Sequence, residues 1–199
     1  MKTRNLILAV LSVFVLSSCS AELIAPAEGT ATKSILETEY NALNVTSVNS
    51  EMVSLPAITL SEAENILKSL RSHKNAEEEL QVNTHDEGEA HIWDLLMKQT
   101  IDYKYSLSIE LHITSYDDGS LFYNGYNAGC TLDKILWKVG GFSFESDKNS
   151  PDDFKFKSTS DIFIKIAADN GKFEFYKVPV AITGTYQPKK QSSNYTYTL

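Results

Sequence analysis

The chain has 199 residues, with 18 basic and 26 acidic side chains, and its formal net charge is −8. An acidic chain repels the phosphate backbone of nucleic acids, and no basic stripe in the sequence opposes that repulsion, so the composition argues against nucleic-acid binding. The same charge argues against adsorption to an anionic membrane by electrostatic attraction alone.

The N-terminal segment has the layout of a secretory signal peptide. Lys2 and Arg4 precede an apolar run of 11 residues, Leu6–Leu16, which only one serine interrupts, and small residues follow. A positive start, a short apolar stretch and a small-residue cleavage site define such a signal. A membrane-spanning helix needs about 20 apolar residues, so this run is too short for a permanent span. We therefore expect residues 1–18 to be a signal peptide.

The tetrapeptide Leu16-Ser17-Ser18-Cys19 ends this segment. It resembles the lipobox of bacterial lipoproteins, and the resemblance covers residues 1–20. It implies that the Cys19 thiol receives a diacylglyceryl group, that the signal is cut before Cys19, and that the new amine is acylated. More than one acyl chain gives stable anchoring, whereas a single chain holds only reversibly. Lipidation of Cys19 and attachment to a membrane are thus predicted, and secretion after cleavage nearby is the alternative.

The residues after Cys19 bear on which membrane is involved. Ser20 stands where lipoproteins retained at the inner membrane often carry aspartate, which favours the outer membrane. Some relatives in gut Bacteroidetes carry an acidic run here that routes them to the cell surface, but this chain offers only Glu22 and Glu28. Periplasmic and surface-facing orientations both remain open. In general layout the chain is similar to uncharacterised Bacteroidetes lipoproteins, and the folded domain resembles no known family.

Composition divides the remaining chain into three parts. Residues 19–58, rich in Ala, Ser, Thr and Asn, are expected to be the lipidated cysteine and a flexible tether. Residues 59–187 are long enough for a single β-rich domain, and residues 188–199 read as a polar tail. Cys130 is the only cysteine after Cys19, so no internal disulfide can form, and we expect it to be a small buried residue.

A helix is expected at the start of the domain, in the stretch "SEAENILKSLRSHK" at residues 61–74. Ser61 and Glu64 have capping-box spacing, and apolar residues recur at the helical period. The segment 89–99 fits either a helix or a strand, and we favour a strand. Every odd position from Ile101 to Ile113 is apolar, which predicts one half-buried strand with Tyr103 and Tyr105 in its core-facing stripe.

Two hairpins follow from turn signals. The turn at 117–119, "DDG", leads to a partner strand, and the turn at 169–171, "DNG", joins strands on either side. Pro179 cannot donate to a ladder, so the second strand is expected at an edge or a bulge there. Between the hairpins we expect a strand broken at Gly140-Gly141. The predicted fold class is α+β, with one N-terminal helix packed on a mainly antiparallel sheet, and a β-sandwich with one helix is the alternative.

The most suggestive cluster for chemistry is "HDEGEAH", residues 85–91. If it is extended, His85, Glu87, Glu89 and His91 point to one side, and adjacent pairs could share an ion. It lacks the His-Glu-x-x-His spacing of zinc peptidases, and we expect a solvated acidic loop. A nucleophile elbow and a phosphate-binding loop are also missing, so we predict no catalytic residue, metal ligand or cofactor.

Aromatic residues supply the remaining candidate site, because exposed aromatic rings beside polar groups grip sugars and protein surfaces. We expect a binding surface of Tyr123, Tyr126 and Trp137. The predicted function is a non-enzymatic, lipid-anchored cell-envelope protein that binds a partner protein or a glycan. One alternative is an envelope hydrolase or metal-dependent enzyme that uses His85–His91, and another is a structural subunit of a surface assembly, with its strand edge at Pro179.

Overall fold

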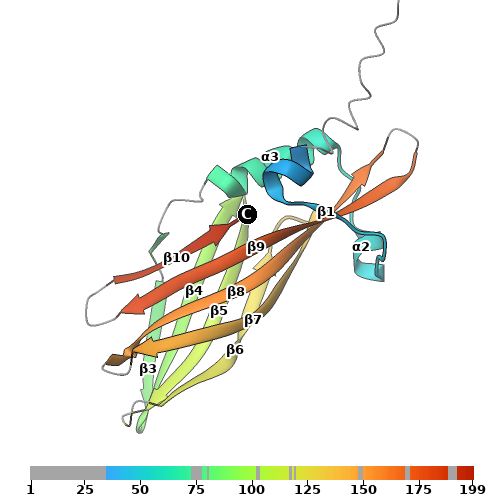
Figure 1. Ribbon diagram of the computed structural model, residues 1–199. Coiled ribbons are helices and arrows are strands. Elements are labelled where there is room, and N and C mark those ends of the chain that lie inside the picture. Colours follow the sequence, from blue (N-terminus) through green and yellow to red (C-terminus); the bar gives the residue numbers. More distant parts are fainter. Residues whose placement is uncertain are drawn as a thin grey trace, which may run out of the picture.

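Two antiparallel sheets facing each other make up the computed structural model (Figure 1), which describes residues 35–72, 78–79, 81–101, 104–116, 118, 120–147, 150–168, 171–187 and 192–199. The expected signal peptide and Cys19 lie outside this part of the chain. Among the described residues, no helix is both long and apolar enough to cross a membrane.

The four-stranded sheet is a meander of consecutive strands. It contains β3 (Gln81–Glu87), β4 (Ala90–Ile101), β5 (Tyr105–Tyr116) and β6 (Leu121–Cys130), paired in that order. The segment 89–99 therefore belongs almost entirely to a strand, as we favoured. The partner strand predicted after residue 119 is β6.

The six-stranded sheet holds the C-terminal half of the chain. Its order is β2 (Glu78–Glu79), β10 (Ser192–Thr198), β9 (Phe173–Gln187), β8 (Ser150–Ala167) and β7 (Ile135–Asp147), and β1 (Leu43–Asn44) also pairs with β9. The second predicted hairpin is confirmed as β8–β9, closed by a hydrogen bond of 2.9 Å from the Ala168 amide to the Lys172 carbonyl. In β7 the register shifts between Val139 and Phe142, which is the interruption expected at the two glycines.

A single apolar core lies between the sheets. Side chains of a strand alternate between its two faces, so every second residue of β5, β8 and β9 points inward. The inward residues are almost completely buried: Leu107, Ile109, Leu111 and Ile113 from one sheet, and Ile162, Ile164, Val178 and Ile182 from the other. Burying one such side chain stabilises the fold by roughly 1.5–3 kcal/mol, so the sandwich depends on these two facing stripes.

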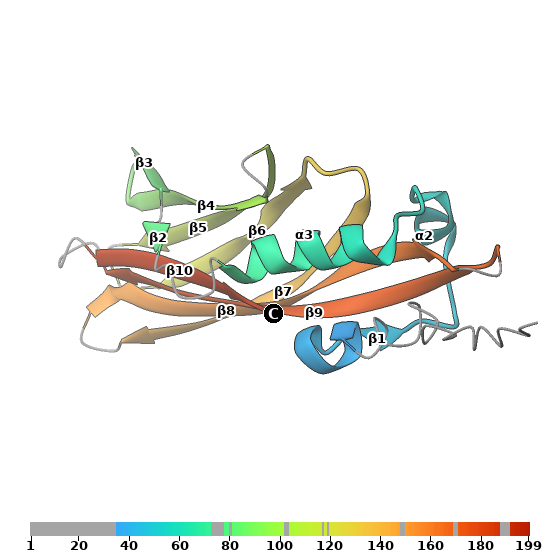
Figure 2. The ribbon, with the colours of Figure 1, turned by 90° about the horizontal axis from the view of Figure 1, so that it is seen from above.

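The predicted α+β fold class is wrong, because the molecule is a β-sandwich, which was the alternative. The expected helix exists as α3 (Leu60–Ser72), and it contacts β4 and β8 along one side of the sandwich (Figure 2). It does not cover a sheet face, because the second sheet does so. Its cap also differs from the prediction: the Thr59 hydroxyl accepts a hydrogen bond of 3.2 Å from the Glu62 amide, ahead of the expected Ser61.

The folded part extends beyond residues 59–187 in both directions. Residues 35–40 and α2 (Ser50–Ser54), which we placed in the tether, bury Leu36 and Met52 against the domain. Residues 192–198, which we placed in a polar tail, form β10, and its Tyr195 and Tyr197 are buried. Only Thr196 separates these tyrosines, and Ser and Asn residues precede them, so the polar composition hid a strand.

The single strand predicted from Ile101 to Ile113 is instead two strands and a turn. Ile101 ends β4, its carbonyl accepts a hydrogen bond of 3.2 Å from the Lys104 amide, and β5 begins at Tyr105. Tyr105 is 37% exposed, so it is not the core residue that we expected, and Tyr103 lies outside the described residues. The alternating pattern continued across the turn by coincidence of spacing.

Pro179 lies in β9 at a point where one side of the strand has no neighbour in the described chain. On that side β1 pairs with residues 176–177 of β9, and β10 pairs with residues 181–187. Pro179 falls between the two ranges and pairs only with Asp161 of β8. Its missing N–H is therefore placed where no ladder hydrogen bond is required, which is the local edge that the sequence predicted.

Candidate binding site on the six-stranded sheet

The three aromatic residues that we expected to form a binding surface do not share one. Trp137 is 9% exposed, and its indole N–H donates a hydrogen bond of 2.9 Å to the Ser160 hydroxyl inside the core. Tyr126 is half-buried and donates a hydrogen bond of 2.6 Å to the Val139 carbonyl. Tyr123 is more open, at 37% exposure, and partial burial raises the pKa of its hydroxyl. Only Tyr123 retains enough surface to touch a ligand.

Tyr123 and Tyr126 instead belong to an aromatic cluster between β6 and β7. The Tyr123 ring lies 5.1 Å from the Phe144 ring, and the Tyr126 ring lies 5.6 Å from the Phe142 ring. Such pairs contribute about 0.5–1.5 kcal/mol beyond the area that they bury. The cluster joins the edges of the two sheets.

The histidine segment at residues 85–91 is a hairpin and not one extended strand. Strand β3 ends at Glu87, the chain turns at Gly88 with φ +66°, and β4 begins at Ala90. His85 pairs with Ile92, and His91 pairs with Asp86 one position away, so the two histidines face opposite sides. The alignment of four side chains on one side, which we considered only for a fully extended segment, therefore does not occur.

The polar contacts of this hairpin are local. The Nδ1 atom of His91 lies 2.7 Å from the Asp86 carboxylate, and the Nε2 atom of His85 lies 3.8 Å from the Glu87 carboxylate. All four side chains are substantially exposed. In the described part of the chain, His, Cys, Asp and Glu side chains form no group of three or more that could hold a metal ion.

A half-exposed histidine network that the sequence analysis missed lies on the outer face of the four-stranded sheet. Asp94 and His112 are direct cross-strand neighbours, and the His112 Nδ1 atom lies 2.7 Å from the Asp94 carboxylate. The His112 Nε2 atom lies 3.0 Å from the Asn127 amide nitrogen. We assign the proton to Nδ1, since this tautomer donates to Asp94 and accepts from Asn127. Both ring nitrogens are thus used within the sheet.

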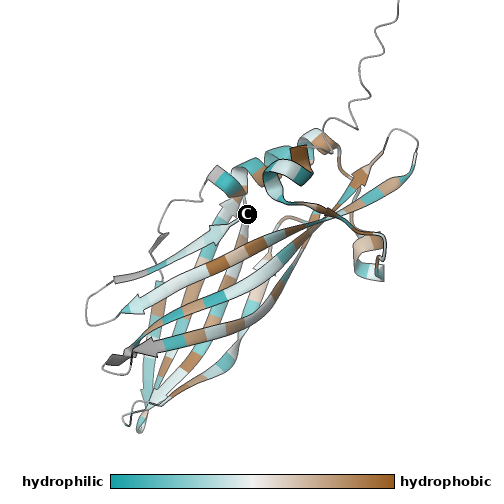
Figure 3. Ribbon diagram, viewed as in Figure 1, coloured by the Kyte–Doolittle hydropathy of each residue, from teal (hydrophilic) through white to brown (hydrophobic). Residues whose placement is uncertain are grey.

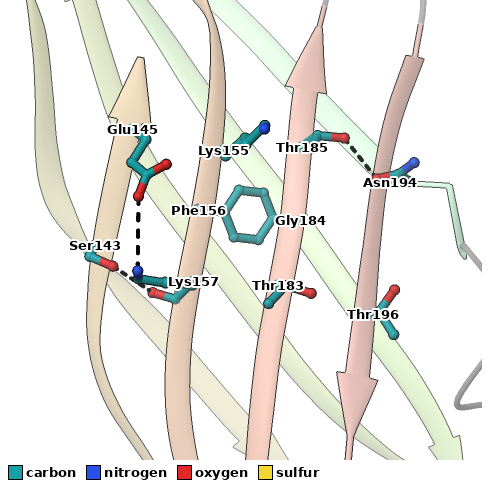
Figure 4. Close-up of a pocket in the computed structure, with 10 residues that line it drawn as sticks. All are labelled: Ser143, Glu145, Lys155, Phe156, Lys157, Thr183, Gly184, Thr185, Asn194 and Thr196. Carbon is teal, nitrogen blue, oxygen red and sulfur yellow. Dashed lines mark hydrogen bonds and ion pairs between the residues drawn. The ribbon is translucent and has the colours of Figure 1, made fainter. Parts of the chain in front are cut away.

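A hollow of about 410 Å³ lies on the outer face of the six-stranded sheet (Figure 4). Four neighbouring strands line it through their outward positions, which recur every second residue. The outward side chains are Ser143 and Glu145 of β7, Lys155 and Lys157 of β8, Thr183 and Thr185 of β9, and Asn194 and Thr196 of β10. No aromatic side chain projects from these positions, so the wall is made of hydroxyl, amide, ammonium and carboxylate groups.

Gly184 and Phe156 form the floor of the hollow. They are cross-strand partners, and both belong to the inward-facing register. A Cβ atom at Gly184 would lie 2.1 Å from the Phe156 Cζ atom, because the ring occupies the space where a side chain would be. Phe156 is only 2% exposed. The glycine thus lets a core ring pack directly against the backbone beneath the hollow.

The polar groups of the hollow are partly held by one another. The Thr185 hydroxyl donates a hydrogen bond of 2.7 Å to the Asn194 side-chain oxygen, and the Ser143 hydroxyl lies 3.4 Å from the Lys157 carbonyl (Figure 4). The Lys157 ammonium lies 3.9 Å from the Glu145 carboxylate, but both side chains are highly exposed, so this pair contributes little to stability. These groups can donate to and accept from a polar ligand.

Residues 26–199 match a family model described as a domain of unknown function, DUF5033, and the chain belongs to that family. Neither the comparison with curated proteins nor the comparison with solved structures finds a match. The family assignment covers the whole sandwich and supplies no ligand or reaction.

Proposed function

We propose that this DUF5033 protein is a lipid-anchored cell-envelope protein that binds a glycan in the hollow of the six-stranded sheet, and that it does so without catalysis. The observation that carries the proposal is the wall of eight outward polar side chains around a hollow of about 410 Å³. Ligand sites of proteins occupy roughly 300–1,000 Å³, so the hollow is large enough for a short stretch of sugar.

The chemistry of the wall suits a polyhydroxylated ligand. Each sugar hydroxyl both donates and accepts hydrogen bonds, and the threonine and serine hydroxyls of the wall do the same. Lys155 and Lys157 add donors, and Glu145 adds an acceptor, so the wall has no single charge sign that would select a strongly charged ligand. These features favour a neutral or weakly charged glycan over a phosphate group.

The anchor is proposed from the lipobox-like tetrapeptide that ends at Cys19, and the outer membrane is favoured because Ser20 follows it. The orientation is decided by treating intact and lysed cells with a protease. Loss of the folded domain from intact cells places it on the surface, where it would meet external polysaccharide. Protection until lysis places it in the periplasm, where envelope glycans are the available ligands.

The binding proposal is tested with a panel of soluble polysaccharides and isothermal titration calorimetry. Thr183→Trp fills the exposed centre of the hollow, and Thr183→Val removes only its hydroxyl. Thr84→Val, at an exposed position on β3 of the other sheet, is the matched control. We expect Thr183→Trp to weaken binding at least about tenfold, equivalent to about 1.4 kcal/mol, and Thr84→Val to bind as the parent does.

Failure of the folded parent to bind any polysaccharide of the panel would contradict the glycan proposal. Equal binding by the parent and Thr183→Trp would contradict the assignment to this hollow. Capture of an envelope protein whose binding is lost in Thr183→Trp would replace the glycan with a protein ligand at the same place.

A further inference from the structure

Exposed apolar side chains gather at one end of the molecule. This end comprises β1, α2 and the tip of the β8–β9 hairpin (Figure 1), and its ribbon includes strongly apolar positions (Figure 3). Four of the exposed large apolar residues belong to it: Leu43 at 56%, Val48 at 38%, Val53 at 51% and Phe173 at 55% exposure. We call this set the apolar tip.

The apolar tip is organised around one lysine. The Lys165 ammonium donates a hydrogen bond of 2.7 Å to the Val53 carbonyl and lies 4.4 Å from the centre of the Phe173 ring. The Val45 amide donates a hydrogen bond of 2.8 Å to the Phe175 carbonyl, which attaches the β1 segment to the same hairpin. Leu43 and Phe173 are therefore held on paired strands, and α2, which carries Val53, is attached to the same hairpin through Lys165.

The charges around the tip are mixed, and they include Glu51 of α2, which pairs with Lys138 of β7. Lys165 and Lys172 lie at the hairpin, and Lys177 pairs across β1 with Leu43. The nearest acidic partner, Asp161, lies 3.6 Å from Lys177, and Glu174 accepts a hydrogen bond of 3.1 Å from the Tyr176 hydroxyl. Lysines beside exposed apolar groups can place their stems along apolar surface and their ammonium groups among lipid phosphates.

The proposed anchor joins the fold at this same end. Residues 20–34 separate Cys19 from Ile35, the first described residue, and β1 of the tip follows shortly after it at Leu43. Even fully extended, this stretch spans at most about 55 Å, so a lipid on Cys19 would hold residue 35 within that distance of the bilayer. We infer that the apolar tip docks on the lipid surface, with Phe173, Leu43 and Val53 entering the headgroup region. This inference rests on the lipid anchor of the proposed function.

The docking is tested by quenching of tryptophan fluorescence. The full chain is expressed with its own signal, purified from membranes, and reconstituted in phosphatidylethanolamine–phosphatidylglycerol vesicles with or without brominated acyl chains. Phe173→Trp reports on the tip, and Phe122→Trp, on β6, is a matched control because Phe122 is 54% exposed. The parent supplies the background from Trp93 and Trp137.

We expect brominated lipid to quench the added emission of Phe173→Trp about twofold or more, since interfacial side chains sit about 5–10 Å into the headgroup and acyl boundary. The added emission of Phe122→Trp should be unchanged. A lipidated chain in which both variants behave alike would overturn the docking while leaving the anchor and the glycan site intact. A chain whose mass shows no lipid on Cys19 would overturn the anchor and the docking together.

Discussion

The hydroxyl of Tyr195 joins the two sheets beyond the point where the described part of β3 begins. Strand β3 begins at Gln81 opposite Leu96, whereas the preceding β2 residues pair with β10 of the other sheet. Among the described residues, Lys98 of β4 therefore has no strand partner on that side. Tyr195 replaces it, because its hydroxyl accepts a hydrogen bond of 2.8 Å from the Lys98 amide and donates one of 2.8 Å to the Lys98 carbonyl.

We predict that Tyr195→Phe lowers the free energy of unfolding by about 2 kcal/mol, since each of the two hydrogen bonds contributes about 0.5–1.5 kcal/mol net. Tyr195 is 3% exposed, so water cannot readily replace the lost hydroxyl, and the retained ring keeps the apolar packing. For a domain of this size the loss corresponds to a fall in melting temperature of about 6 °C.

The assay is urea unfolding followed by circular dichroism, with hydrogen exchange at the Lys98 amide as a local readout. Tyr116→Phe is the control, because Tyr116 is 40% exposed and its ring is kept. We expect the control to match the parent and the Lys98 amide to lose protection only in Tyr195→Phe. An unfolding free energy within about 0.5 kcal/mol of the parent, with Lys98 still protected, would refute the reasoning.

Three further predictions concern single positions. Gly184→Ala should lower the free energy of unfolding, measured in urea, by about 2 kcal/mol, because the new methyl group meets the Phe156 ring. Adding Phe156→Leu to this variant should recover part of the loss. An unchanged free energy of unfolding in Gly184→Ala would contradict this packing. Burial raises the pKa of the Cys130 thiol, so it should react slowly with a disulfide reagent when folded and rapidly in denaturant. Equal reactivity in the folded and denatured states would show that the thiol is accessible to the reagent in the folded protein. Since the thiol pKa is higher in the folded state than in the unfolded state, the free energy of unfolding should fall as the pH rises above the pKa of the unfolded state. Urea unfolding of Cys130→Ala should lack this part of the pH dependence. Cys19→Ala should move the protein from the detergent phase to the aqueous phase in phase-partitioning of cell extracts, and an unchanged distribution would exclude a lipid on that residue.

The central strands were predictable from the sequence because one face of each is buried, whereas β3 and β10, which are more polar, were missed. The alternation of apolar and polar residues located most of β5, and the turn residues located the β8–β9 hairpin. The class of fold was not predictable in this way, because an apolar strand face indicates that it is buried but not whether a helix or a second sheet covers it. Here a second sheet covers it, and α3 packs only along one side.

The hollow was not predictable for a related reason. Its wall consists of outward polar residues such as Thr183 and Lys157, and such residues have the same pattern whether they face bulk solvent or a ligand. The one unusual signal was Gly184 within an otherwise regular strand, which indicates a close approach of another group. Trp137 misled the prediction for the opposite reason, since a large aromatic residue can equally well fill a core.

The outer face of the six-stranded sheet changes character along its length. Around Lys165 it carries exposed apolar groups, and at Lys157, eight residues away along β8, it carries the polar wall of the hollow. At the rise of an extended strand these two positions are about 27 Å apart. If the apolar tip rests on the bilayer and β8 rises from it, the hollow stands clear of the lipid headgroups and open to a ligand that approaches along the membrane surface. The sheet would then serve as a rigid spacer, and shortening the linker before Ile35 should leave glycan affinity unchanged.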